Sequence, residues 1–340
     1  MRTTMKDVAL QANVSIKTVS NVIHKRAARV SPATSARILQ VIEELGYQPN
    51  PAARQLRKAE TGILALAVPR LDNPYFASIA RHVIDAGERR GRIVLVDHTY
   101  GEHERELKTV QGLRPGIIDG IIFDPQALAE GDIQGLSSHI PVVLIGEQLL
   151  AASFDHVLID NEAAAKTATE HLIALGRKRI GVIGLDFAPG TQVQGLRMSG
   201  YVDALRSSDR AIDEALIVPS VTGLLDRQDG ALAMQVLLDQ DPKPDSVFCF
   251  NDMMAIGAMR LAYDRGIRIP EDIAFASIDG NEEGEFSVPS LTSVRPDSEA
   301  LATLAVDLLI QRIENRRYEE TQLHYVPFSL LIRESTIGES

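Results

Sequence analysis

The first 46 residues carry apolar side chains at the spacing of three short amphipathic helices. Within the segments 4–12, 16–23 and 32–45, apolar residues recur every three or four positions and therefore share one helical face. These positions are Val8, Ala9 and Ala12 in the first segment, Val19, Val22 and Ile23 in the second, and Ile38, Val41, Ile42 and Leu45 in the third. The pattern predicts a small all-α head with a marginal core.

Polar residues at the ends of these segments predict where the helices begin. Thr4, with Asp7 three positions later, resembles a capping box, and Ser31, directly before a proline, is a typical N-cap. Asn13 tolerates the left-handed backbone of a tight turn, and Ser15 can cap the helix that follows. A helix, a tight turn and a second helix at this spacing predict a helix-turn-helix, although a plain helical hairpin in a bundle shares some of these features.

From residue 62 onward the pattern changes to short apolar runs that alternate with helical stretches. Continuous apolar runs such as "ILALAVP", "GIIFD", "PVVLIG" and "SVFCFN" are typical of parallel strands covered on both faces. About ten such units exceed one sheet, so the body is expected to be α/β, with two doubly wound parallel-sheet subdomains. No window is long and apolar enough for a membrane span, and "MRTTMKDVAL" has no signal-peptide core, so a cytoplasmic protein is expected.

The segment 49–61, "PNPAARQLRKAET", lies between head and body and has the composition of a very short basic helix. Asn50 and the proline after it form a cap pair, and good helix formers surround Leu56. An isolated helix of about eight residues is unstable in water, because nucleation costs more than so few hydrogen bonds return. The segment is therefore expected to fold only against a partner.

The charge of the chain is divided between its two parts. Residues 1–60 have a formal charge of +6, whereas the remaining residues have −17, within a total of −11. A basic head on an acidic body indicates that only the head meets a polyanion. The second helix of the motif would present its outer face to a DNA major groove. That face carries Ile16, Lys17, Thr18, Ser20 and Asn21.

Sequence motifs for catalysis and for cofactors are not found. No G-x-G-x-x-G follows a strand, and the chain has neither a Walker A sequence nor a G-x-S-x-G elbow, so neither an enzyme nor a cofactor is expected. The single cysteine, Cys249, lies in an apolar run and is interpreted as a buried structural thiol. His98 and His103 flank an acidic segment, which favours a solvated loop over a metal site.

The head resembles the DNA-binding head of the lac repressor (LacI/GalR) family along its whole length, through "TMKDVALQANVSIKTVSNVI" and "VSPATSARILQVIEELGYQPNPAARQLR". The resemblance implies that hinge helices of two subunits enter the minor groove, with Leu56 as a wedge between base steps. Arg57 would lie beside it on a phosphate or in the groove, and Ala53 would face the partner helix or the groove floor. His24 departs from the usual Asn of the family, and the basic loop after it can replace a phosphate contact. The full set of predicted DNA contacts is Thr4, Ser15, Ile16, Lys17, Thr18, Ser20, Asn21, Lys25, Arg29, Tyr47, Asn50, Ala53, Leu56 and Arg57.

The body is similar to the ligand-binding core of the same family, through "DNPYFASI", "GLRMSGYVDAL", "FNDMMAIGAMR" and "SIDG". The resemblance implies two subdomains with a ligand cleft between them and three chain crossings, which we expect near residues 161, 289 and 320. The expected domains are a head at 1–48, a hinge at 49–61 and a body at 62–340. Within the body, one subdomain would comprise 62–160 and 290–320, and the other 161–289 and 321–340.

Six residues match positions that contact the effector in the family: Phe76, Asp124, Glu147, Arg197, Asn251 and Asp279. Arg197 can bind an anionic group or ring hydroxyls, and Asp279 can accept two hydroxyls. Structural roles are the alternative, since Asp279 could cap a turn and Asn251 could cap a helix. Gly146 stands where several members have an acidic contact, and Thr191 weakens a purine assignment, so the resemblance favours a sugar or sugar derivative.

The sequence thus predicts a homodimeric transcriptional regulator, most simply a repressor, that binds a palindromic double-stranded DNA operator and is controlled by a small effector, with no membrane partner. Two alternatives remain at this point. One is a solute-binding or sensor protein without specific operator binding, and the other is a regulator that requires a corepressor.

Overall fold

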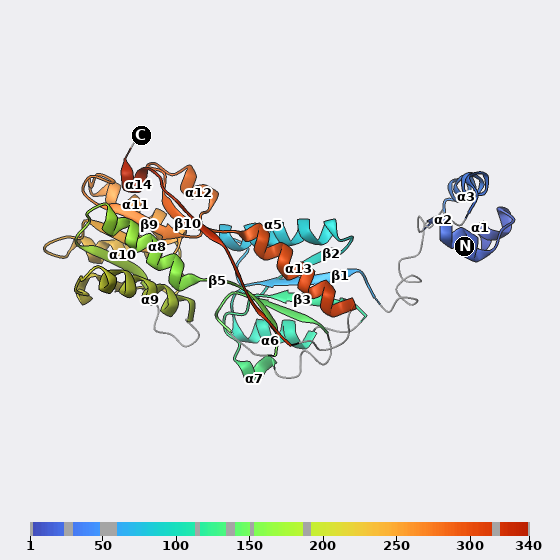
Figure 1. Cartoon of the computed structure of the whole chain (residues 1–340), viewed down its shortest axis with the longest axis horizontal. Helices are drawn as coiled ribbons and strands as arrows, with labels where there is room; N and C mark the ends of the chain where they lie inside the picture. The colour runs from blue at the N-terminus through green and yellow to red at the C-terminus, as the bar shows by residue number, and fades with distance from the viewer. Residues whose placement is uncertain are drawn as a thin grey trace. The chain divides into compact units, whose positions relative to one another are not determined.

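The structure is a computed structural model of the whole chain, and it describes residues 3–23, 30–47, 60–112, 116–133, 140–149, 153–185, 192–314 and 320–338. The chain divides into two compact units, Met1–Thr61 and Gly62–Ser340 (Figure 1). The predicted hinge contacts Asn50, Ala53, Leu56 and Arg57 and the loop contacts Lys25 and Arg29 lie outside the described residues.

The head unit contains the three predicted helices, α1 (Met5–Gln11), α2 (Ile16–Ile23) and α3 (Pro32–Glu44). The capping box is present, because the backbone N–H of Thr4 donates to Asp7 at 2.8 Å while that of Asp7 donates back to the Thr4 hydroxyl at 3.4 Å. Asn13 has the left-handed φ of 48° that the tight turn between α1 and α2 requires. The apolar faces of the three helices meet in one small core that also contains Tyr47.

In its described residues, the body contains two sheets, which confirms the predicted pair of parallel-sheet subdomains, and each sheet has six strands. The first has the order β11-β5-β4-β3-β1-β2 and the second the order β12-β10-β9-β8-β6-β7. All paired strands are parallel except β10 and β12. The strands of the first sheet are β1 (Ile63–Val68), β2 (Ile93–His98), β3 (Gly120–Phe123), β4 (Val142–Ile145), β5 (Asp155–Ile159) and β11 (Leu323–Val326). Those of the second are β6 (Ile180–Leu185), β7 (Ile217–Pro219), β8 (Ser246–Cys249), β9 (Ala274–Ile278), β10 (Thr292–Pro296) and β12 (Phe328–Leu331).

Helices cover both faces of each sheet, which explains the continuous apolar runs of the strands. On the first sheet, α5 (Pro74–Arg89) and α13 (Ser298–Glu314) share a core on one face, and α6 (His103–Gly112) and α7 (Glu130–Ile133) cover the other (Figure 1). On the second sheet, α8 (Asn161–Ala174) and α9 (Gln192–Ser207) cover one face, and α10 (Arg227–Leu238) and α11 (Asp252–Asp264) the other. The remaining short elements are η3 (Glu214–Leu216), α12 (Glu282–Glu285) and α14 (Glu334–Ile337).

The crossings between the two sheets differ in part from the sequence prediction. The first follows β5 at Asp160, close to the predicted residue 161. The second lies at Asp297, not near 289, because β10 pairs with β9 in the second sheet before α13 returns to the first. The third lies at Pro327, not near 320, because β11 still pairs with β5. Both errors arise because strand pairing, which local sequence does not encode, decides the sheet to which each strand belongs.

Candidate functional site

The recognition surface of the head follows from the way α2 packs. Val19 and Val22 are buried, which turns Ile16 and Lys17 to the exposed side of the helix, with Thr18, Ser20 and Asn21 half-buried at its borders. The Ser15 hydroxyl accepts the backbone N–H of Thr18 at 3.1 Å and caps α2. The residues predicted to read the major groove therefore lie on one accessible face of a short, capped helix.

Two other predicted DNA contacts have structural roles in the head. Thr4 is exposed and caps α1 with its hydroxyl. Tyr47 is only 7% exposed and packs in the head core, a role that the sequence analysis missed. The available signal for this burial was an aromatic residue shortly after the third helix. The core of so small a domain needs every large side chain within reach.

The predicted effector contacts lie at the carboxyl ends of strands or on adjacent helices. Asp124 follows β3, Asn251 follows β8 and Asp279 follows β9, while Glu147 lies just beyond β4. The charges of Asp124, Asp279 and Glu147 all raise the pKa of the Tyr75 hydroxyl, after burial as the main cause, and the charge of Arg197 lowers it. Contacts join these residues: Arg197 lies 3.9 Å from Asp279 and is linked to Glu147 through Asn161, Gly146 beside Glu147 lies against Asp124, and Tyr75 and Asp279 line the same groove. We call Tyr75, Asp124, Glu147, Arg197 and Asp279 the inter-sheet site.

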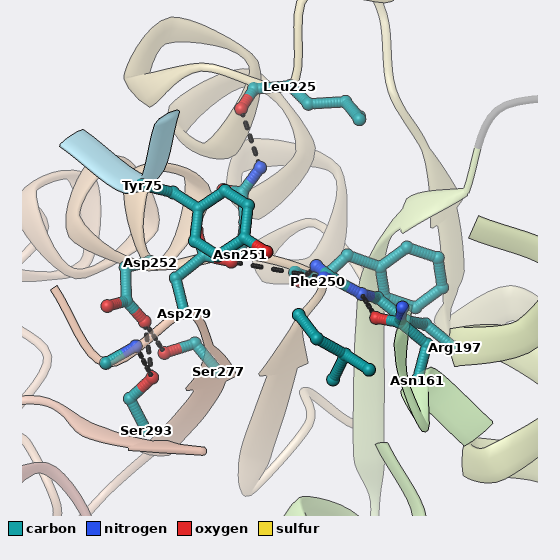
Figure 2. Close-up of polar contacts among 12 residues, drawn as sticks. Tyr75, Asn161, Arg197, Leu225, Phe250, Asn251, Asp252, Ser277, Asp279 and Ser293 are labelled. Atoms are coloured by element: carbon teal, nitrogen blue, oxygen red, sulfur yellow. Dashed lines mark hydrogen bonds and ion pairs between the residues drawn. The ribbon is translucent and has the colours of Figure 1, made fainter. Parts of the chain in front are cut away.

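Arg197 on α9 is held by partners around its guanidinium. It donates from Nε to Oδ1 of Asn161 at 2.7 Å and from Nη1 to the carbonyl oxygen of Phe250, and its Nη2 lies 3.9 Å from Oδ1 of Asp279 (Figure 2). α9 can approach α8 this closely because Gly200, about one turn after Arg197, has no Cβ. A Cβ there would lie 2.1 Å from the carbonyl oxygen of Glu162 on α8.

Glu147 is buried and bound through both oxygens. It accepts the backbone N–H of Ile159 at 2.8 Å and Nδ2 of Asn161 at 2.7 Å. Because Asn161 also accepts from Arg197, the amide links the carboxylate to the guanidinium. Burial raises the pKa of Glu147 to about 7, although these hydrogen bonds and Arg197 oppose the shift.

Asp124 takes the space that the glycine at position 146 leaves free. A Cβ on Gly146 would lie 3.0 Å from Oδ1 of Asp124, so the carboxylate that follows β3 packs directly against the backbone of Gly146. Gln126 donates to the same oxygen at 2.6 Å. Burial raises the pKa of Asp124, and the charges of Glu147 and Glu106 raise it further.

A buried carboxylate that the sequence analysis missed fixes the loop beyond Asp124. Glu106 on α6 accepts the backbone N–H groups of Gln126, Ala127 and Leu128 at 2.7, 2.9 and 3.1 Å. No local motif signals this role, because the partners are twenty residues away. Glu106 therefore positions Asp124 and Gln126 and does not itself belong to the inter-sheet site.

Asp279 has a backbone φ of 133°, which non-glycine residues rarely adopt. A fully buried neighbour, Asp252, stabilises this turn by accepting the hydroxyls of Ser277 and Ser293, both at 2.6 Å, and the backbone N–H of Asn281 at 2.7 Å (Figure 2). Burial raises the pKa of Asp279, and the charge of Arg197 opposes the shift. Asp252 is a second positioning residue that the sequence analysis did not find, and strained backbone of this kind is often associated with binding sites.

Asn251 has the capping role that the sequence analysis kept as an alternative. Its Oδ1 accepts the backbone N–H of Met254 at 2.8 Å, and its Nδ2 donates to the carbonyl oxygen of Leu225 at 2.9 Å. Leu225 has a left-handed φ of 51° and lies in a loop built around Asp229, which accepts three of its backbone N–H groups. Asn251 therefore positions this loop beside the site, and Leu225 is a neighbour that the sequence analysis missed.

The aromatic residues of the site come from the first turn of α5. Phe76 packs against the core of the first sheet, and its ring meets that of Tyr75 edge to face with centroids 5.2 Å apart. Tyr75 and Asp279 also line a groove of about 1110 Å³ that extends along α5, α12 and the start of α13. Tyr75 is among the residues that line this groove, whereas the predicted contact Phe76 is not, and the tyrosine beside it in "PYF" was the available sequence signal.

The raised pKa of Glu147 predicts a contribution to the stability of the body that is lost as the pH rises. Glu147 has a folded pKa of about 7, above its ordinary value, so the folded chain binds more protons than the unfolded chain between about pH 4.5 and pH 7. The carboxyl groups of Asp124, Glu147 and Asp279 should therefore lower the free energy of unfolding through this window, whereas His82 and His171, whose pKa values are lowered by burial, act in the opposite direction. In Glu147→Gln the proton uptake on folding should fall by about one. Urea unfolding at pH 5, 6, 7 and 8 would measure how the free energy of unfolding depends on pH. An equal dependence in the variant and the parent protein would contradict the raised pKa of Glu147.

Other candidate chemistry is not observed in the described parts of the chain. No helix there is long and apolar enough to cross a membrane, and no group of three or more His, Cys, Asp or Glu side chains could hold a metal ion. His103 forms a hydrogen bond with Asp132 at 3.0 Å, and Cys249 is buried without a disulfide. Burial raises the pKa of the Cys249 thiol, consistent with a structural role.

Comparison with known proteins places both units in one family. The profile of the bacterial regulatory proteins of the lacI family matches residues 4–50, and that of the periplasmic binding protein-like domain matches residues 169–336. The ribose operon repressor of Halalkalibacterium halodurans is 33% identical over 336 residues, which cover 99% of this chain and 98% of that protein. The HTH-type transcriptional repressor PurR of Vibrio atlanticus is 30% identical over 319 residues, covering 93% of this chain and 94% of that protein.

A solved structure of a related regulator has the same fold. The transcriptional regulator CelR in complex with cellobiose aligns over 98% of this chain and 100% of its own, with 28% identity and a TM-score of 0.71. These relatives are transcriptional regulators, not enzymes, and they share both the helix-turn-helix head and the two-sheet body. The chain belongs to the lacI family of bacterial regulatory proteins.

Proposed function

We propose that this protein is a dimeric repressor that binds a palindromic operator and responds to a carbohydrate effector bound at the inter-sheet site. The exposed face of α2, on a compact head with the helix-turn-helix geometry, is the observation that carries the DNA-binding part. The names of the two relatives, both repressors, support repression. Because the proposed operator is chromosomal, the protein would act in the cytoplasm, and as a regulator without catalytic activity.

The dimer is supported by the surface of the edge strand β2. It is the last strand of its sheet, and Ile93 and Leu95 on one face are 63% and 50% exposed. An exposed apolar edge of this kind is normally covered in native proteins, and a second copy would cover it symmetrically. Two copies would place two recognition helices on the two half-sites of a palindrome.

The carbohydrate part is supported by the chemistry of the inter-sheet site. Asp124 and Asp279 are carboxylates that can accept ring hydroxyls, Tyr75 offers an aromatic face, and CelR was solved with cellobiose. Asp124, Arg197 and Asp279 would bind the effector directly. Glu147 would orient Arg197 through Asn161, and Phe76 would support Tyr75.

Selection of genomic DNA fragments on the purified protein at moderate salt tests the proposal. We expect enrichment of one short palindrome, bound by two copies of the chain. Enrichment without symmetry, or salt-sensitive binding without sequence preference, would contradict a dimeric repressor. The selection is repeated with a metabolite extract, because enrichment only with the extract would indicate a regulator that requires a corepressor.

The hinge part of the proposal predicts the effect of Leu56→Ala. If Leu56 acts as a wedge in the minor groove, the variant should bind the selected operator about 10-fold or more weakly, because unstacking a base step involves a few kcal/mol. Effector affinity and thermal stability should not change. Anisotropy titrations with the palindrome would measure the effect, and unchanged operator affinity would rule out the wedge.

We expect a hydrogen bond between loops of the two sheets to act as a latch, that is, to stabilise the effector-bound state. Arg70, fixed by Asp72 at 2.7 Å, donates from Nη1 to the carbonyl oxygen of Leu224 at 3.0 Å. Arg70 follows β1 and Leu224 follows β7, so the bond joins elements of different sheets. Arg70→Ala should weaken effector binding about 10- to 150-fold, as expected for a hydrogen bond from a charged group. Arg260→Ala, on an exposed pair with Asp264, is the control in the same calorimetric titration, and equal affinities would exclude the latch.

A further inference from the structure

The body holds its first residue, Gly62, through the strands on both sides of β1. Gly62 directly follows the predicted hinge, residues 49–61, and begins the body unit. Its backbone N–H donates to Oδ2 of Asp119 at 2.7 Å, and its carbonyl oxygen accepts the backbone N–H of Ile93 at 2.9 Å. The carbonyl oxygen of Ile63 accepts the backbone N–H of Asp119 at 2.7 Å. The backbone at the start of β1 is therefore held in one orientation.

A buried ion pair holds the carboxylate that binds Gly62. Nη1 of Arg92 donates to the same Oδ2 of Asp119 at 2.9 Å, and the two side chains are only 10% and 5% exposed. Arg92 lies directly before β2 and Asp119 directly before β3, and these strands pair with β1 on its two sides. We call Arg92 and Asp119 the entry pair, because they bridge the chain at the point where it enters β1. Buried ion pairs contribute little net stability, and their directional bonds favour one arrangement of the chain over others.

Gly62 also turns the chain at this point. Its backbone φ is 76°, which residues with a Cβ rarely adopt, although a Cβ here would meet no atom within 4 Å. The backbone conformation, and not lack of space, therefore favours glycine at position 62. The direction in which the preceding residues leave the body depends on this turn and on the entry pair.

A second buried pair of the same kind lies at the start of other strands of the first sheet. Asp155, the first residue of β5, accepts Nε of Arg312 at 2.7 Å and the backbone N–H of Gln322 at 3.1 Å. The side chains of Asp155 and Arg312 are 2% and 21% exposed. The chemistry matches that of the entry pair, but the backbone that this carboxylate holds leads into β11 and not into β1. The two pairs therefore allow a matched comparison.

We propose that Arg92 and Asp119 are positioning residues for operator binding, because they fix the direction in which the predicted hinge leaves the body. This inference rests on the proposed DNA-binding function, and the two residues would act through the hinge without contacting DNA. Two recognition helices must reach two half-sites at once, so each hinge has to leave its body in a defined direction. A free exit adds conformations that operator binding has to remove. Fixing the backbone of one residue costs a factor of about 5 to 30 in an equilibrium constant.

Asp119→Asn tests the entry pair in the full-length protein. The variant keeps an oxygen that can accept the N–H of Gly62 but removes the charge that holds Arg92. Anisotropy titrations with the palindrome selected by the parent protein should show at least about 10-fold weaker binding. Asp155→Asn is the matched control, with a comparable loss of thermal stability but operator affinity within about 3-fold of the parent protein. Equal losses of operator affinity in the two variants, or unchanged affinity in Asp119→Asn, would overturn the positioning role.

A pair of glycine variants decides the inference even if Asp119→Asn does not fold. Gly62→Ala changes only the preferred φ, since a Cβ there meets no atom. Gly176→Ala, after α8, introduces the same strain at a φ of 81° and also in open space. Operator affinity should fall at least about 5-fold in Gly62→Ala and should remain within about 2-fold of the parent protein in Gly176→Ala. Equal affinities in the two glycine variants would contradict a fixed exit of the hinge.

The selection of DNA fragments on the parent protein separates this inference from the proposed function. A parent protein that enriches no palindrome would overturn the proposed function and the positioning role with it. An enriched palindrome that the matched variants bind equally well would overturn only the positioning role.

Discussion

Replacing Lys17 and Asn21 together with alanine should remove operator preference while leaving non-specific DNA binding largely intact. Lys17 is exposed and Asn21 is half-buried on the outer side of α2, whereas Val19 and Val22 hold the helix in the head core. A good contact between a side chain and a base edge contributes about 1–3 kcal/mol of discrimination. Two such contacts in each half-site predict a loss of at least about 100-fold in affinity for the selected palindrome.

Anisotropy titrations with the selected palindrome and a scrambled duplex at one salt concentration would measure this effect. The specific affinity should fall toward that of the scrambled duplex, because phosphate contacts elsewhere in the basic head remain. Arg37→Ala removes one positive charge from the exposed side of α3 and serves as the matched control. An equal loss on both duplexes would mean that Lys17 and Asn21 contact phosphates and do not read the sequence.

Removing Arg197 or neutralising Asp279 should make the protein insensitive to its effector. Arg197 connects α9 with Asn161, the carbonyl of Phe250 and Asp279, so its loss affects several members of the site at once. Loss of one partner of a buried charged pair typically costs about 2–5 kcal/mol. We therefore expect effector affinity to fall by about 100-fold in Asp279→Asn and at least as much in Arg197→Ala.

Operator release by effector, followed by anisotropy, and effector titration by calorimetry would test this expectation. Operator affinity without effector should remain within about 3-fold of the parent protein, because neither residue lies in the head unit proposed to bind DNA. Arg206→Ala, an exposed position on the same helix, is the control. Asp279→Asn keeps the size of the side chain, so unchanged effector affinity in this variant would place the effector elsewhere.

Residues outside the binding surface position the inter-sheet site. Glu106 fixes the loop after β3 through three backbone N–H groups, and Asp252 fixes the turn at Asp279 through two serine hydroxyls and one backbone N–H. Both are fully buried carboxylates that convert loops into rigid supports. Rigid support of this kind reduces the entropy that ligand binding would otherwise lose.

Local signals were sufficient to predict the elements of this protein. The box of Thr4 and Asp7, the left-handed Asn13 and the apolar faces of the head helices act within a few residues, so the sequence alone determines α1, α2 and α3. Apolar runs likewise predicted most strands of the body, because covered parallel strands are buried on both faces. The resemblance to the LacI/GalR family added the positions of Asp124, Glu147, Arg197 and Asp279, which the structure brings together in one network of contacts.

Contacts between distant residues decided what the sequence analysis missed. β10 and β11 were assigned to the wrong sheets, because partner strands determine membership in a sheet. The burial of Tyr47 and the double role of Asn251 depend on neighbours that only the folded chain supplies. The charged neighbours of Arg197 also depend on the folded chain, because electrostatic interactions depend on distance and burial, which sequence order does not specify. The sequence thus determined the elements and the family, whereas the tertiary structure decided which strands pair and which charged side chains meet.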